Sequence, residues 1–150
     1  MRIFTIGYEQ VTQPAVLETL RAAGVGLLVD VRAVAASRRP GFAKSHIAAG
    51  VAEQGIGYVH LRKLGTPAEG RLAARTGRYG DLKRIYDAHL QTPEAVKEFA
   101  DLSRLVREAG RPVCLMCYER HPEHCHRGIL ADLLCEEPDR ETEHLFASPI

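Results

Sequence analysis

Short, nearly continuous apolar runs alternate along this chain with longer stretches in which apolar side chains recur every three or four positions. The continuous runs predict strands that are buried on both faces of a parallel sheet. They lie at residues 2–7, 26–31, 57–61 and 112–117, with 141–146 as a further candidate strand. The other spacing predicts helices at residues 13–24, 44–55, 80–90, 93–109 and 125–135. Residues 62–79 have glycine and proline but no clear period, so we expect a long connecting loop there, of a length that is usually functional.

Strands that alternate with helices indicate an α/β fold. We expect a three-layer sandwich with a mainly parallel central sheet of about 4–5 strands. The chain has the length of one domain, so residues 1–150 should form a single unit. Ligands of open parallel sheets bind outside the carboxyl ends of the strands. The loops after the first four predicted strands should therefore form the functional rim.

The composition narrows the class of protein. Hydrophobic residues make up 45% of the chain and charged residues 26%, as in an ordinary globular domain. No apolar run is long enough to span a membrane and no signal-peptide pattern is present, so we expect a cytoplasmic protein without a membrane partner. The net charge of +1 is compatible with a homo-oligomer. Basic residues are concentrated in 32–46 and 62–84, on the predicted rim, which favours an anionic ligand.

Residues 117–128, CYERHPEHCHRG, form the densest group of reactive side chains in the chain. They include two cysteines, three histidines, two glutamates and two arginines. All four cysteines of the chain lie in its last third, unlike those of a disulfide-stapled secreted domain, so we expect thiols or ligands rather than disulfides. Side chains of these types could bind a metal ion, activate a thiol nucleophile or bind an anion. They could also form an ordinary polar turn.

A metal site is a minor alternative for this group. Cys114 and Cys117 have the spacing of a zinc knuckle, but both lie in a predicted strand, where side chains three apart point to opposite faces. The remaining set of suitable ligand types is Cys117, His121, Cys125 and either His124 or His126. A single loop would supply them all, so we assign no metal ligand. A structural metal-binding interaction module stays a second alternative.

Thiol chemistry would use Cys125. This residue is expected at or near a helix N-terminus beside His124, His126 and Arg127, and a helix dipole and cationic neighbours lower the pKa of a thiol. The segments LLVDVR and SHI, with a cysteine between a late strand and a helix, are similar to those of rhodaneses. The loop here is longer, and Ala131 stands where the phosphatase pattern has an arginine. A cysteine-dependent enzyme of rhodanese-like or related sulfur or phosphoryl chemistry is therefore an alternative.

Anion binding is the leading hypothesis. A helix N-terminus presents unpaired amides to an anion, and Arg127 and His126 fall in the first turn, where basic residues do not favour the helix itself. Arg32 follows the second predicted strand, and its planar guanidinium suits phosphate. Asp30 and Glu119 could orient these groups, transfer protons or bind Mg²⁺. Ion pairs Asp30–Arg32 or Glu119–Arg127 that only tie the loops together are the structural alternative.

Four segments occur in the order TIGYE, LVDVR followed by SRRPGF, GIGYVHLRKLG, and CYERHPEHCHR. In these segments the chain resembles the domain-of-unknown-function 488 family. The resemblance implies signature positions at Gly7, Asp30, Arg32, Ser37, Phe42, Leu64, Gly65, Cys117, Glu119, Cys125, His126 and Arg127. The chain departs from the family pattern in AVAAS, which lacks a proline before Ser37, and at Thr66, where a glycine is common. The resemblance implies a compact α/β domain and supplies no reaction.

Together these inferences predict that a phosphate-bearing small molecule, such as a nucleotide, or a nucleic acid binds at the carboxyl rim. The expected ligand-binding residues are Arg32, Ser37, Lys44, Cys117, His126 and Arg127. The expected catalytic residues are Asp30, Glu119 and Cys125. The sequence indicates no particular cofactor and does not decide whether a reaction follows binding.

Overall fold

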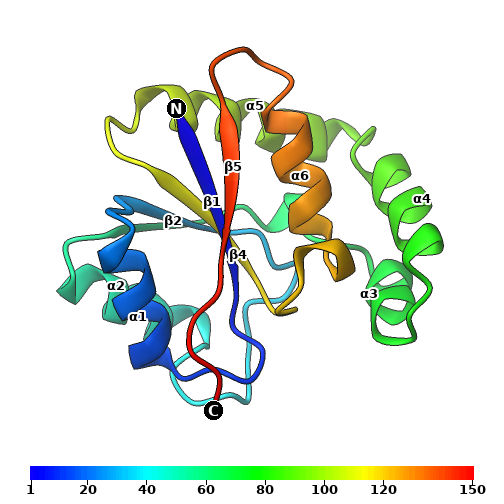
Figure 1. Ribbon diagram of the computed structural model, residues 1–150. Coiled ribbons are helices and arrows are strands. Elements are labelled where there is room, and N and C mark those ends of the chain that lie inside the picture. Colours follow the sequence, from blue (N-terminus) through cyan, green and yellow to red (C-terminus); the bar gives the residue numbers. More distant parts are fainter.

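A computed structural model describes residues 1–150 and shows one five-stranded parallel sheet in the order β3-β2-β4-β1-β5 (Figure 1). The strands are β1 (Arg2–Gly7), β2 (Leu27–Asp30), β3 (Gly57–His60), β4 (Val113–Cys117) and β5 (Glu141–Leu145). The helices are α1 (Gln13–Ala22), α2 (Lys44–Glu53), α3 (Ala68–Arg75), α4 (Tyr79–His89), α5 (Pro93–Glu108) and α6 (His126–Leu134). Short 3-10 turns follow β3 at Arg62–Leu64 (η1) and precede α6 at Pro122–His124 (η2). The predicted α/β sandwich is confirmed.

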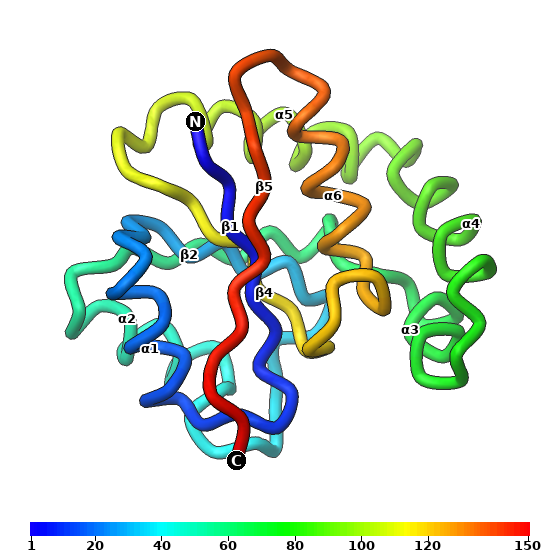
Figure 2. The backbone as a smooth tube through the Cα atoms, in the orientation of Figure 1, coloured from blue at the N-terminus to red at the C-terminus, as the bar shows by residue number.

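The two faces of the sheet carry separate hydrophobic cores. On one face α1 and α2 cover the sheet, and Val16 and Ile47 pack there with Cys114 of β4. On the other face α5 and α6 cover it, and Leu102 packs there with Cys117 of β4. The tube view shows these helix pairs on opposite sides of the strands (Figure 2). Cys114 and Cys117 thus point to opposite faces, as the strand period requires.

The helix α3 was not predicted, and the expectation of a structureless loop over residues 62–79 was wrong. The buried residues of α3 are Gly70 and Ala73, whereas its leucine, Leu72, is about half exposed. A helix that packs through small residues shows no apolar stripe in its sequence. Alanine, arginine, leucine and glutamate nevertheless favour helix over its eight residues.

The strand order creates a crevice at the carboxyl end of β4. The chain leaves β1 and β2 toward α1 and α2 on one face, and it leaves β4 toward α6 on the other face. Because β4 lies between β1 and β2, the connections diverge on both of its sides. Such switch points are where open α/β sheets bind ligands. None of the helices is long and apolar enough to cross a bilayer.

Candidate functional site

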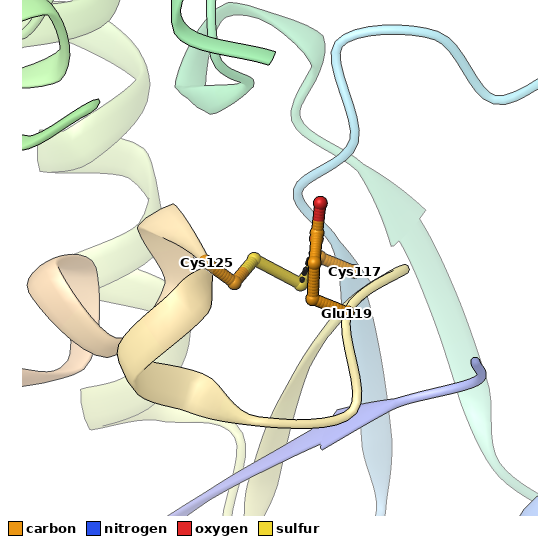
Figure 3. Close-up of side chains that lie close together, drawn as sticks. All are labelled: Cys117, Glu119 and Cys125. Atoms are coloured by element: carbon orange, nitrogen blue, oxygen red, sulfur yellow. Dashed lines mark hydrogen bonds between the residues drawn. A yellow bond between two sulfur atoms is a disulfide. The ribbon is translucent and has the colours of Figure 1, made fainter. Parts of the chain in front are cut away.

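Two cysteines face each other where β4 ends. Cys117 is the last residue of β4, and Cys125 is the N-cap of α6. Their sulfur atoms are joined in a disulfide, and their Cα atoms are 7.5 Å apart (Figure 3). The expectation that all four cysteines are thiols or ligands is therefore corrected for this pair, while Cys114 and Cys135 are free. The two cysteines are eight positions apart in the sequence, so only the return of the chain into α6 brings the sulfurs together.

Each sulfur has a polar neighbour of its own. The Arg127 Nη1 atom lies 3.0 Å from Cys117 Sγ, and the Glu119 Oε2 atom lies 3.6 Å from the same sulfur. The His126 Nδ1 atom lies 3.4 Å from Cys125 Sγ. The two sulfurs therefore differ, because Cys117 lies between a cation and a carboxyl group and Cys125 lies beside an imidazole.

The ring of His126 is held in one tautomer. Its Nε2 atom lies 2.7 Å from the carbonyl oxygen of Val31, and because a carbonyl can only accept, Nε2 carries the hydrogen. The Nδ1 lone pair is then directed at Cys125. Burial lowers the pKa of His126 to about 4, so the imidazole is neutral at neutral pH and can accept a hydrogen bond from a thiol.

Arg127 is fully buried and organises the loop after β4. Its side chain donates to the carbonyl oxygens of Glu119 and Arg120 as well as to Cys117. Burial lowers its pKa to about 10, so it stays charged at neutral pH. Burial also raises the pKa of the Glu119 carboxyl, and the charge of Arg127 counteracts that rise. The loop thus holds a buried cation and a carboxyl group of raised pKa beside Cys117.

The glycine at the end of β1 permits this arrangement. A Cβ atom on Gly7 would lie 1.7 Å from the carbonyl oxygen of Glu119, which is the oxygen that Arg127 binds. Gly7 pairs with Cys117 in the sheet. Close approach of the β4 loop to β1 therefore depends on the absence of a side chain.

Asp30 and Arg32 form a buried ion pair. The Arg32 Nη2 atom lies 2.7 Å from Asp30 Oδ2, and Arg32 Nη1 donates to the Phe42 carbonyl oxygen and the Tyr8 hydroxyl. Asp30 is also bound by the hydroxyl of Tyr58. Burial alone would lower the pKa of Arg32. The hydrogen bonds and the negative charge of Asp30 have the larger combined effect, so the pKa of Arg32 is raised. The ion pair that the sequence left open as the structural alternative is thus present.

These contacts show where the residues predicted to bind an anion lie. Arg32 is committed to Asp30, and Arg127 donates through Nη1 and Nη2 to carbonyl oxygens and sulfur. The Nε of Arg127 has no partner, but it is buried. Ser37 accepts from the Arg39 amide at 3.1 Å, and Lys44 is exposed at the start of α2. Neither Ser37 nor Lys44 lines the cavity beside the cysteines. The structure does not gather the six predicted ligand-binding residues around one anion.

The cysteine pair opens to a cavity of about 110 Å³ at the carboxyl rim. Five of the predicted site residues line it: Arg32, Cys117, Glu119, Cys125 and His126. The sequence did not assign Thr66 and Arg71, which form another part of its wall. Arg71 comes from the unpredicted α3, and its Nη1 donates to the Thr66 carbonyl oxygen at 2.8 Å. The concentration of basic residues in 62–84 was the signal that pointed to this wall.

Of the histidines considered as metal ligands, His126 lies beside Cys125, whereas His121 and His124 make their contacts elsewhere. The ring of His124 stacks on Tyr79 with the centroids 4.3 Å apart, and His121 lies beside His124 and Phe146. The group that could hold a metal consists instead of Cys117, Glu119 and Cys125. Of the residues considered from the sequence, Cys117 and Cys125 belong to this group, and Glu119 joins them in place of a histidine.

The model of the family described as domain of unknown function DUF488 matches residues 12–134. The chain belongs to the DUF488 family. No curated protein and no solved structure matches it. The part of the chain that the DUF488 model covers includes the cysteine pair, Glu119, His126 and Arg127, so the site lies within the family domain.

Proposed function

We propose that this DUF488 protein is a thiol–disulfide oxidoreductase in which Cys125 attacks the substrate and Cys117 resolves the intermediate. The observation that carries the proposal is the joined sulfur pair in the wall of a cavity at the carboxyl rim. Each sulfur also has a proton-accepting group next to it. Exchange between a dithiol and a disulfide is faster when the attacking sulfur is accessible and can lose its proton.

Cys125 is the better nucleophile of the two. It is the N-cap of the nine-residue helix α6, where the helix dipole stabilises a thiolate. The neutral His126 accepts the thiol proton at Nδ1, and Val31 orients the ring from the other side. This is the arrangement of a nucleophile, a base and a group that orients the base. Because the pKa of His126 is about 4, the ring relays the proton rather than storing it.

The exchange starts from the dithiol. The thiolate of Cys125 attacks one sulfur of a substrate disulfide, the substrate S–S bond breaks, and the first substrate thiolate leaves with the proton relayed by His126. Cys117 then gives its proton to the carboxylate of Glu119 and attacks the sulfur of Cys125. The second substrate thiol leaves with that proton. Two electrons have passed to the substrate, the protein holds the Cys117–Cys125 disulfide, and a dithiol reductant restores the starting state.

Arg71 indicates the charge of the substrate. It lines the cavity, and no acidic side chain pairs with it. Arg75 on the same helix is close enough to lower the pKa of Glu119 through its charge. A disulfide with a negatively charged group suits this wall, which keeps an anionic ligand in the proposal without the arginines first assigned to it.

Reaction of the reduced protein with a carboxylated, chromogenic aromatic disulfide tests the proposal. All variants carry Cys135→Ser, because Cys135 is the partly exposed free cysteine, whereas Cys114 is buried in the core. The parent should release two equivalents of thiol. Cys117→Ser should release one and retain a mixed disulfide on Cys125, which intact mass detects. Cys125→Ser should react about tenfold or more slowly, because it loses the activated thiolate.

The unmodified protein provides the control for reactivity. Differential alkylation should label Cys125 far faster than Cys135, and the Cys135→Ser parent should keep the two-equivalent release. Equal labelling of the two cysteines, or release of two equivalents by Cys117→Ser, would overturn the assignment of attacking and resolving residues.

A further inference from the structure

The loop that carries the cysteine pair also brings together three metal-ligating side chains. One ligand atom each from Cys117, Glu119 and Cys125 lies within 4.8 Å of the other two. Figure 3 shows the Glu119 side chain next to the sulfur of Cys117, with Cys125 facing it from the start of α6. Sulfurs that bind one tetrahedral zinc ion at about 2.3 Å are about 3.8 Å apart. Small side-chain rotations would therefore place all three atoms around one ion.

We infer that the reduced protein binds one Zn²⁺ through the thiolates of Cys117 and Cys125 and the carboxylate of Glu119. Two thiolates favour zinc over the harder cations magnesium and calcium. All three side chains line the cavity, so the fourth position faces space that a water molecule or a substrate can enter. Three protein ligands with one open position are typical of catalytic rather than structural zinc sites.

The backbone spacing of the two cysteines suits an ion between them. Their Cα atoms are 7.5 Å apart, whereas the usual range for disulfides is about 4.4–6.8 Å. An ion that separates the sulfurs needs a wider spacing of the backbone than a direct bond does. Reduction followed by metal binding therefore requires little movement of β4 or α6.

The charges around the site also balance with zinc. Two thiolates and one carboxylate carry three negative charges against the two positive charges of the ion. The Nη1 atom of Arg127, 3.0 Å from Cys117 Sγ, supplies the remaining positive charge and a hydrogen bond to a ligand sulfur. Partners of this kind orient metal ligands and tune the affinity of the site. Arg127 thus acquires a role that explains a fully buried guanidinium beside a cysteine.

The disulfide and the metal exclude each other, because the disulfide leaves neither sulfur as a thiolate. Zinc binding is therefore controlled by the redox state of the pair. The inference does not rest on the proposed exchange reaction, since a dithiol at this place binds zinc whether or not Cys125 attacks a substrate.

Titration of the reduced, metal-free protein with Co²⁺, followed by displacement with Zn²⁺, tests the inference. We expect one equivalent of Co²⁺ to give a thiolate-to-metal charge-transfer band, which one equivalent of Zn²⁺ abolishes. Cys117→Ser and Cys125→Ser should lose the band, and Cys135→Ser should keep it. Glu119→Gln should weaken binding at least about tenfold, the loss typical of a changed outer-sphere partner, because it alters a direct ligand.

Oxidation of the unmodified protein keeps the test decisive if a serine variant fails to fold. Diamide-oxidised protein has every side chain in place, and it should give no band until a reductant is added. Absence of the band from the reduced protein, or an equal band from the oxidised protein, would falsify the inference. Thiol exchange is measured with a chelator present, so failure of zinc binding and failure of the exchange reaction are separate results.

Discussion

At the scale of single residues, the Asp30–Arg32 pair shows why a charged residue at a functional rim need not bind a ligand. Asp30 is fully buried at the end of β2, and Arg32 is 6% exposed. The carboxylate receives two hydrogen bonds from the Arg32 guanidinium, one from the Arg32 amide and one from the Tyr58 hydroxyl. Loss of one partner leaves the other charge buried without compensation, which is far more destabilising than loss of a surface pair.

Asp30→Asn should therefore lower the free energy of unfolding by about 3–5 kcal/mol. The matched control is Asp87→Asn, which removes the exposed pair between Lys83 and Asp87 on α4 and should cost less than about 1 kcal/mol. Urea denaturation of the two variants measures both values. Similar losses for the two would contradict an organising role for the buried pair.

At the scale of elements, the contact between the end of β1 and the loop after β4 connects the sheet to the cysteine pair. Gly7 and Cys117 are neighbours in adjacent parallel strands. The carbonyl of Glu119 occupies the space that a side chain on residue 7 would need. Displacement of this carbonyl would move the loop that positions Cys117 and Arg127.

Gly7→Ala should lower the melting temperature and slow the reaction of the cysteine pair, because the new methyl group displaces the Glu119 carbonyl. Gly80→Ala is the control, since no atom outside α4 lies within 4 Å of its added Cβ and its backbone has ordinary helical geometry. That change should stabilise the protein by about 0.5–1 kcal/mol. Thermal unfolding and differential alkylation follow the two effects. A Gly7→Ala variant with unchanged melting and alkylation would show that the loop accommodates the methyl group freely.

The elements that the sequence predicted are those with a strong pattern. Buried strands such as β4, VCLMC, are continuous apolar runs, and α5 begins at the predicted cap, where Thr92 accepts from the Ala95 amide. The helix α3 escaped prediction because its packing uses Gly70 and Ala73.

In the candidate site, too, the sequence predicted the features with a local pattern and missed those that depend on tertiary structure. The density of reactive groups in residues 117–128 located it, and the helix-end position of Cys125 was correct. The pairing of Cys117 with Cys125 depends on a loop path that no local pattern encodes. The wall around Arg71 depends on the position of a helix that the sequence did not reveal.

At the scale of the whole molecule, the segment after β5 connects the loops that follow β1 and β4 at the carboxyl rim of the sheet. It passes from β5 across the loops that follow β1 and β4 (Figure 1). Arg120 donates to the carbonyl oxygen of Ala147 at 2.9 Å, and the amide of Ile150 donates to Gln10 at 2.7 Å. Ala147 is buried in the core on the α1 and α2 side of the sheet. The segment therefore supports the loops that surround the cysteine pair.

Deletion of residues 147–150 should destabilise the protein by about 2 kcal/mol, chiefly through the hydrogen bond of Arg120. Amide hydrogen exchange should increase in residues 118–121, whereas α5, on the far side of the sheet, should change little. Deletion of Ile150 alone is the control, because it keeps the Arg120–Ala147 hydrogen bond. Equal exchange in residues 118–121 for the two deletions would show that the segment does not support this loop.

The strand order also governs what happens during synthesis on the ribosome. The first strand to be made, β1, pairs only with β4 and β5, which are the last two strands to emerge. At about 5–20 residues per second, β1 waits roughly 5–20 seconds for β4. During that time Ile3, Phe4 and Ile6, all buried in the finished protein, have no strand to pair with. We therefore expect chaperones that bind short apolar segments to bind the nascent chain, and the cysteine pair can form only after residue 125 has been made.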